Sequence, residues 1–146
     1  MPSIFCICST SVNRVTAASI RIITDDLEGV VQFYERVTDV PAVRYTPVFA
    51  ELKLPSATLA IGHTQTAQLF GADSARPADN HTVIIEFRVD DVDSEYERLK
   101  PLVNDWVQEP TTMPWGNRSI LFRDPDGSLV NLFTPVTEEA VERSDG

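Results

Sequence analysis

The chain has 146 residues and a formal net charge of −10, with 42% hydrophobic and 23% charged residues. This length and composition suit one soluble domain, or two small modules that share a core. The negative charge argues against nucleic acid as a partner, because phosphate binding needs a basic face, and no apolar run approaches the ~20 residues that span a bilayer. The charge would suit a cationic small ligand at long range, and it also aids solubility.

The first residues carry no basic segment and too short an apolar run for a signal peptide, so we expect a cytoplasmic protein. Cys6 and Cys8 are the only cysteines. Two thiols alone do not fill a zinc site, and a disulfide between such close neighbours would be strained. We expect reduced thiols in an N-terminal extension, residues 1–14.

The first module is expected over residues 15–63. Alternation around Ile20 and Ile22 predicts a half-buried strand. Asp26 then offers an N-cap for a helix with apolar residues at i, i+3, i+4 and i+7 spacing. Residues 49–54 and 58–61 are predicted as two further strands.

Residues 64–81 are predicted as a linker with a short turn, because they are rich in Ala, Thr, Asp and Gln. Residues 82–136 then repeat the order of the first half. A strand leads to Asp91 as an N-cap, a striped helix follows, and another strand begins at Trp106. The turn Asp124-Pro125-Asp126-Gly127 joins the last two strands. Residues 137–146 are expected to be an acidic, solvated tail.

Each half therefore has the order βαβββ, and this repetition supports the assignment more than any single element does. The apolar strand faces and helical stripes of both halves predict the sheet–helix cores. The expected core residues are Ile20, Ile22, Leu27, Val30, Val31, Tyr34, Ile85, Phe87, Val89, Tyr96 and Leu99.

Three motifs in this order and spacing resemble the vicinal oxygen chelate superfamily, which includes glyoxalase I, extradiol dioxygenases and bleomycin-resistance proteins. They are Leu27…Phe33-Tyr34 after the first strand, Val89-Asp90-Asp91-Val92 after the fifth, and the closing hairpin with the upstream Pro114-Trp115-Gly116-Asn117-Arg118. The resemblance covers residues 15–136. It implies an α+β fold of two βαβββ modules with curved mixed sheets that form a shared cup. It also implies a homodimer, because such modules usually complete their cups by edge-to-edge pairing.

In metal-using members, four residues on the concave faces hold one divalent ion. The resemblance places the equivalent positions, counted from the helix caps and the hairpin glycine, at Ser19, Ala60, Ile84 and Asn131. Zinc and non-haem iron sites need imidazole, thiolate or carboxylate ligands, and this set supplies none of them. His63 and His81 fall outside these positions. We therefore expect no metal and no cofactor, and no metal-dependent glyoxalase or dioxygenase activity.

The same alternation predicts the residues that would line the cup and contact a ligand. They are Arg21, Phe49, Glu51, Ile84, Glu86, Arg88, Trp115, Arg118 and Asn131. Arg21 and Glu86 occupy equivalent strands, so they could form a structural ion pair that fills the cavity, or act as polar anchors in a ligand site. Glu86 is also a candidate general base if it is buried.

Three functions remain open. The leading one is a non-enzymatic binder, similar to the bleomycin-resistance branch, that holds a small organic ligand in the cup of a homodimer. The alternative is a metal-free or atypical-metal lyase or isomerase of the same superfamily. The third is an interaction module whose cup is closed by Arg21 and Glu86. No nucleic-acid or membrane partner is expected.

Overall fold

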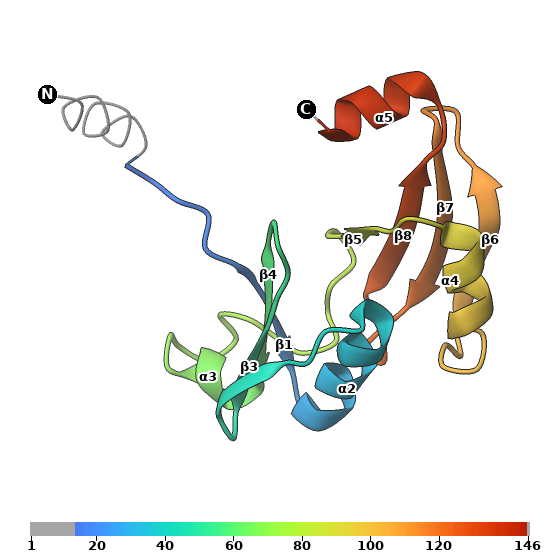
Figure 1. Cartoon of the computed structure of the whole chain (residues 1–146). Helices are drawn as coiled ribbons and strands as arrows, with labels where there is room; N and C mark the ends of the chain where they lie inside the picture. Colours follow the sequence, from blue (N-terminus) through green and yellow to red (C-terminus); the bar gives the residue numbers. More distant parts are fainter. Residues whose placement is uncertain (1–13, 146) are drawn as a thin grey trace, which may run out of the picture.

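Two four-stranded mixed sheets, each with a helix packed on one face, make up the fold. The computed structural model describes residues 14–145. The strand orders are β1-β4-β3-β2 in the first sheet and β5-β8-β7-β6 in the second (Figure 1). Cys6 and Cys8, and the expectation of reduced thiols, lie outside the described residues.

The first module has the predicted order βαβββ. Its elements are β1 (Ile20–Thr24), α2 (Leu27–Thr38), β2 (Val43–Thr46), β3 (Phe49–Lys53) and β4 (Thr58–His63). The side chain of Asp26 accepts a hydrogen bond from the backbone N–H of Gly29 at 3.1 Å, as expected of an N-cap. β1 runs parallel to β4, and β4 and β2 both pair antiparallel with β3.

The second module repeats this connectivity, which confirms the prediction of two similar halves. Its elements are β5 (Ile85–Arg88), α4 (Val92–Leu99), β6 (Trp106–Thr112), β7 (Asn117–Arg123) and β8 (Leu129–Pro135). Asp91 caps α4 by accepting from the backbone N–H groups of Asp93 and Ser94. The predicted turn is present, with Gly127 at φ +90° and its N–H bonded to the carbonyl of Asp124.

Two further helices lie where the sequence predicted a linker and a tail. The linker begins with α3 (Thr64–Gln68), and the C-terminal segment forms α5 (Glu138–Asp145). The acidic residues of this segment are exposed, as expected of a solvated tail, but the segment is helical. It also contacts the second module, because Ala140 is buried and Arg143 bonds to the carbonyl of Trp115 at 2.8 Å. Ala140, Arg143 and the ion pair of Asp145 with Arg88 at 2.8 Å hold this acidic helix against the second module.

The core follows the predicted faces with one correction. Leu27, Val30, Val31, Tyr34, Ile85 and Leu99 are buried, and Ile22, Phe87, Val89 and Tyr96 are partly buried against them. Ile20 is instead 62% exposed. It is the first residue of an edge strand, beyond the reach of the covering helix, so alternation alone placed it too deep.

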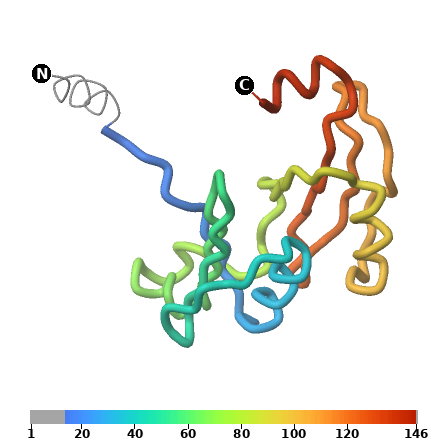
Figure 2. The backbone as a smooth tube through the Cα atoms, viewed as in Figure 1, coloured from blue at the N-terminus to red at the C-terminus, as the bar shows by residue number. Residues whose placement is uncertain are grey.

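The two modules meet through their helices. The hydroxyl of Tyr34 on α2 donates to Asp124 of the β7–β8 turn at 2.6 Å, and Arg98 on α4 donates to the carbonyls of Arg36 and Val37 at the end of α2. The tube in Figure 2 shows the two halves side by side. The sheets do not close into one barrel, and β1 and β5 remain edge strands.

Candidate ligand-binding site

The face of the first sheet that α2 does not cover carries several of the predicted ligand residues. Register places Arg21 of β1 beside Ala60 of β4, and Ala60 beside Glu51 of β3. Phe49 lies beside Gly62 in the next row. Because side chains alternate along a strand, these residues share one face, which we call the first open face.

Arg21 lies among aromatic side chains on the first open face. Its Cζ is 5.9 Å from the centre of the Phe49 ring and 5.5 Å from that of Phe70. Phe70 follows α3 and is 70% exposed. No ion pair joins Arg21 to Glu86 within residues 14–145, so the described structure does not contain the structural pair that the sequence left open.

The equivalent face of the second sheet, the second open face, carries Glu86 beside Asn131. The amide nitrogen of Asn131 donates to a Glu86 carboxylate oxygen at 2.8 Å. Since a carboxylate only accepts, the amide oxygen of Asn131 points away, and this buried oxygen has no hydrogen-bond partner in the described structure. Arg88, two residues further along β5, forms an ion pair with Asp145 of α5 at 2.8 Å.

A groove of about 430 Å³ runs along β5, between this strand and the β3–β4 turn. Three of the predicted ligand residues, Ile84, Glu86 and Arg88, line it. The remaining lining is largely apolar and includes Ile20 and Leu54. Ligand sites usually combine an apolar wall with a few polar groups in a volume of this order, so this groove has the form of a small-molecule site.

The structure places the other two predicted ligand residues away from this groove. Arg118 shares the α4 side of the sheet with Ile120, and its guanidinium bonds bidentately to Asp93 at 2.9 and 3.1 Å. The hydrogen bond from Arg118 lowers the pKa of Asp93. Trp115 is 56% exposed and lies next to α5. Arg118 therefore links β7 to α4, and Trp115 stands at the end of the sheet.

The four positions that hold the ion in metal-using relatives do not carry a fitting donor set. Ser19 and Ile84 each lie one residue before an edge strand, and Ala60 belongs to the first open face but is buried there by its neighbours. Asn131 is already bonded to Glu86. His63 accepts a hydrogen bond from the backbone N–H of Gln65 at the start of α3. Within residues 14–145 no group of three His, Cys, Asp or Glu side chains is placed to bind a metal ion.

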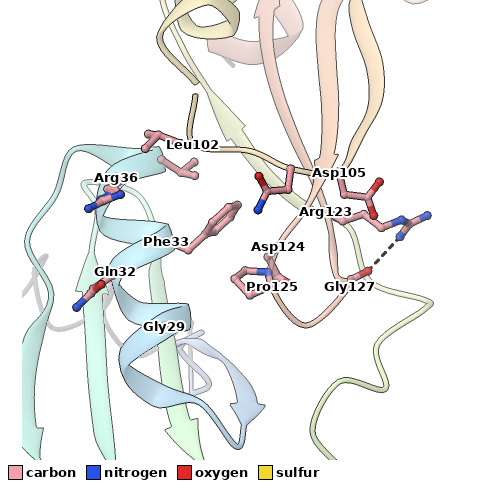
Figure 3. Close-up of a pocket in the computed structure, with 12 residues that line it drawn as sticks. Gly29, Gln32, Phe33, Arg36, Leu102, Asp105, Arg123, Asp124, Pro125 and Gly127 are labelled. Atoms are coloured by element: carbon pink, nitrogen blue, oxygen red, sulfur yellow. Dashed lines mark hydrogen bonds between the residues drawn. The ribbon is translucent and has the colours of Figure 1, made fainter. Parts of the chain in front are cut away.

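A second hollow, of about 460 Å³, lies on the helical side of the molecule (Figure 3). One wall comes from α2, with Gln32, Phe33 and Arg36, and the other from the β7–β8 turn, with Arg123 and Asp124. Arg123 donates to the carbonyl of Gly127 at 3.1 Å. The hollow lies beside the contact between the two modules and contains none of the residues predicted for the cup.

Sequence reasoning missed two residues of the first open face. Phe70 falls in the predicted linker, and only the path of α3 brings it over Arg21. Gly62 lies under Arg21 and Phe49 in β4. A glycine inside a strand often marks the close approach of another group, so Gly62 was a signal that could have been used.

Comparisons with known proteins agree with this architecture. The family model described as the Glyoxalase/Bleomycin resistance protein/Dioxygenase superfamily matches residues 13–132. A comparison with curated proteins gives no match. Within residues 14–145, no helix combines the length and apolar character needed to cross a membrane.

Three similar solved structures show the same fold at low sequence identity. A glyoxalase/bleomycin resistance protein/dioxygenase from Nocardioides is 24% identical, with 94% of each chain covered and a TM-score of 0.70. Lactoylglutathione lyase from Agrobacterium tumefaciens is 23% identical, with 84% of this chain and 96% of that chain covered and a TM-score of 0.62. TioX from Micromonospora sp. ML1 is 22% identical, with 84% and 100% covered and a TM-score of 0.63.

Proposed function

Because the chain belongs to the glyoxalase/bleomycin resistance/dioxygenase superfamily, we propose that it binds a small organic molecule without a metal ion, as a cytoplasmic homodimer. The groove beside β5 carries this proposal. It has a volume of about 430 Å³ and a largely apolar lining, and its polar residues are Glu86, which accepts from Asn131, and Arg88, which pairs with Asp145. An apolar ligand body would gain free energy by leaving water there, and the polar groups would orient it.

The residues at the family's metal positions support a site for organic ligands. One hydroxyl, one methyl, one aliphatic chain and one amide do not supply the charge that a tight divalent site requires. The neighbour of Ala60 in the register is Arg21, a permanent cation that would repel a metal ion. No catalytic step through a metal follows from this set of side chains.

The homodimer is proposed from the edges of the sheets. β1 and β5 each leave one side without a strand partner in the described chain, and exposed edges tend to pair with another chain. Ile20 and Ile84, beside these edges, are 62% and 48% exposed. Sedimentation at micromolar concentration should show about twice the 16.2 kDa of one chain. A single species of monomer mass would contradict the dimer.

A neutral apolar fluorophore tests the groove directly. N-phenyl-1-naphthylamine should bind and brighten in the wild-type protein, and Ile84→Trp should abolish the signal because a larger side chain fills the groove. Val107→Trp is the matched control, since Val107 is 49% exposed against 48% for Ile84 and lies on β6. Binding that Ile84→Trp leaves unchanged would contradict the proposed site.

The enzymatic alternative rests on Glu86, which lines the groove and accepts a hydrogen bond from Asn131. Glu86 is exposed, so the burial that would favour it as a general base is not present in the described chain. Native mass spectrometry of the protein as purified should detect a bound organic molecule, and unfolding the protein should release this molecule chemically unchanged. If the wild type converts that molecule and Glu86→Gln does not, the result favours the metal-free lyase or isomerase over the binder. Stoichiometric bound metal would favour the atypical-metal enzyme.

A further inference from the structure

The guanidinium of Arg21 has aromatic neighbours but no anionic partner. Its Cζ lies over the rings of Phe49 and Phe70 at 5.9 and 5.5 Å. Within residues 14–145 no carboxylate oxygen comes within 4.0 Å of it. A guanidinium is a planar fork of five N–H donors, and a neighbouring aromatic ring is not an acceptor that satisfies them. Its N–H edges therefore remain available to an acceptor from outside the chain.

The sheet beneath is shaped to hold Arg21 in this position. A Cβ on Gly62 would come within 3.3 Å of Cδ of Arg21, 3.6 Å of the Phe49 ring and 2.8 Å of the Thr66 hydroxyl. A side chain at position 62 would therefore crowd the stem of Arg21 and the hydroxyl of Thr66, so Gly62 leaves room for Arg21 to approach β4. The guanidinium is thus placed by packing, so a ligand would not have to order it.

The aromatic surface continues beyond Phe49. The ring of Tyr45 lies 6.2 Å from that of Phe49, and the ammonium of Lys53 lies 5.5 Å from the Tyr45 ring. Glu51 is the acid among these side chains, and it lies 4.0 Å from Lys53. The first open face therefore combines three rings and two cations with one carboxylate, although the chain as a whole carries −10.

We propose that the first open face binds a planar aromatic carboxylate, with the carboxylate on the N–H fork of Arg21 and the ring against Phe49 and Phe70. Guanidinium and carboxylate are matched planar groups that form two parallel hydrogen bonds. The ring attached to such a carboxylate extends away from the fork, and we place it against the rings of Phe49 and Phe70, which border Arg21. This inference rests on the proposed binding function and names the chemical class of the ligand.

The negative charge of the whole chain opposes an anion only at long range. Charges further than a Debye length of about 8 Å are largely screened at 0.15 M salt, whereas a direct contact is not. Aspartates of the linker and of the β7–β8 turn share a neighbouring hollow with Arg21, and none of them approaches it within 4.0 Å. A ligand carboxylate on Arg21 would therefore make a direct contact with the cation, whereas no aspartate of this hollow is in contact with it.

Three naphthalene probes that differ only in the head group test the class. At 0.15 M salt, 2-naphthoate should bind at least about tenfold more tightly than 2-naphthalenemethanol or 2-naphthylmethylammonium, as expected for a charge-assisted bidentate contact. Arg21→Gln should remove this tenfold preference. Phe70→Ala should weaken 2-naphthoate about two- to tenfold through lost stacking. Arg36→Gln and Val107→Ala, which change an exposed cation on α2 and an exposed apolar side chain on β6, should leave it unchanged.

Each result separates this inference from the proposed function. Equal or tighter binding of the ammonium probe, or 2-naphthoate binding that survives Arg21→Gln, overturns the carboxylate assignment and leaves the groove binder in place. If none of the three naphthalene probes binds while N-phenyl-1-naphthylamine still does, the carboxylate assignment is likewise overturned and the groove binder stays in place. Failure of every probe, including N-phenyl-1-naphthylamine, overturns both proposals. Unchanged urea midpoints of Arg21→Gln and Phe70→Ala will show that the variants fold.

Discussion

Tyr34→Phe should destabilise the protein by removing one of the hydrogen bonds that join its two modules. The Tyr34 hydroxyl donates at 2.6 Å to the carboxylate of Asp124, a buried residue that is 5% exposed. The second carboxylate oxygen keeps two backbone N–H donors at 2.9 Å, from Asp126 and Ser128. Since one of three bonds to a buried charge is lost and the ring still packs, we expect a loss of about 1.5–3 kcal/mol in the free energy of unfolding.

The same substitution has a pH signature. Burial, followed by the charge and the hydrogen bond of Asp124, raises the pKa of Tyr34 far above its ordinary value of 10.0. The folded state keeps this phenol protonated while the unfolded state ionises above pH 10, so the wild type loses about 1.4 kcal/mol per pH unit above that value. Tyr34→Phe has no such group, so its deficit should shrink by about 1.4 kcal/mol between pH 8 and pH 11.

Urea unfolding followed by circular dichroism measures both effects. Tyr96→Phe is the control, because the hydroxyl of Tyr96 donates to Glu109 at an exposed site, and its urea midpoint should stay close to that of the wild type at pH 8. A Tyr34→Phe deficit below about 0.5 kcal/mol at pH 8, or one that does not fall by pH 11, would refute the assignment of a buried, charge-assisted bond.

Three further outcomes check the fold and the site. Phe122→Ala should cost about 3–5 kcal/mol in urea unfolding because this fully buried ring packs against Phe33 and Trp106; a loss below about 1 kcal/mol would mean that the ring is not buried. Asp91→Ala should cost about 0.5–2 kcal/mol by uncapping α4, and no change would contradict the cap. Chelators should leave the melting temperature unchanged and added Zn²⁺, Ni²⁺ or Mn²⁺ should not raise it, whereas stabilisation that saturates at one metal per chain would contradict the non-metal proposal.

The sequence was most informative where a structure depends on neighbouring residues. The N-caps at Asp26 and Asp91 and the hairpin at Gly127 are confirmed because each depends on contacts within a few residues. Alternation also predicted which side chains share a strand face. It did not predict how much each is covered, and Phe87, expected in the core, is only partly buried. Coverage depends on where a helix from elsewhere in the chain ends.

The candidate site depended more strongly on such distant segments. Arg21, Phe49 and Glu51 could be assigned to one face from alternation. Phe70 could not, because its position over Arg21 follows from the course of α3 after β4. An ion pair between Arg21 and Glu86, one of the two alternatives that the sequence left open, would require equivalent strands of the two modules to face each other within one chain. Strand patterns show which side chains share a face, but they do not show how the two modules are placed relative to each other.

The relation between the modules is set by contacts of high sequence separation on the helical side. Tyr34 reaches Asp124 across 90 positions, and Arg98 reaches the carbonyls of Arg36 and Val37 across 62 and 61. These bonds hold α2 against the second module. With the helical sides joined, β1 and β5 remain edges and the two open faces lie on separate sheets. A ligand that required both faces would therefore need them brought together by a second chain, whereas one that required only Arg21 and its aromatic neighbours would bind a single chain. Measuring the affinity of 2-naphthoate at protein concentrations above and below any dimer dissociation constant distinguishes the two, because only the first case depends on protein concentration.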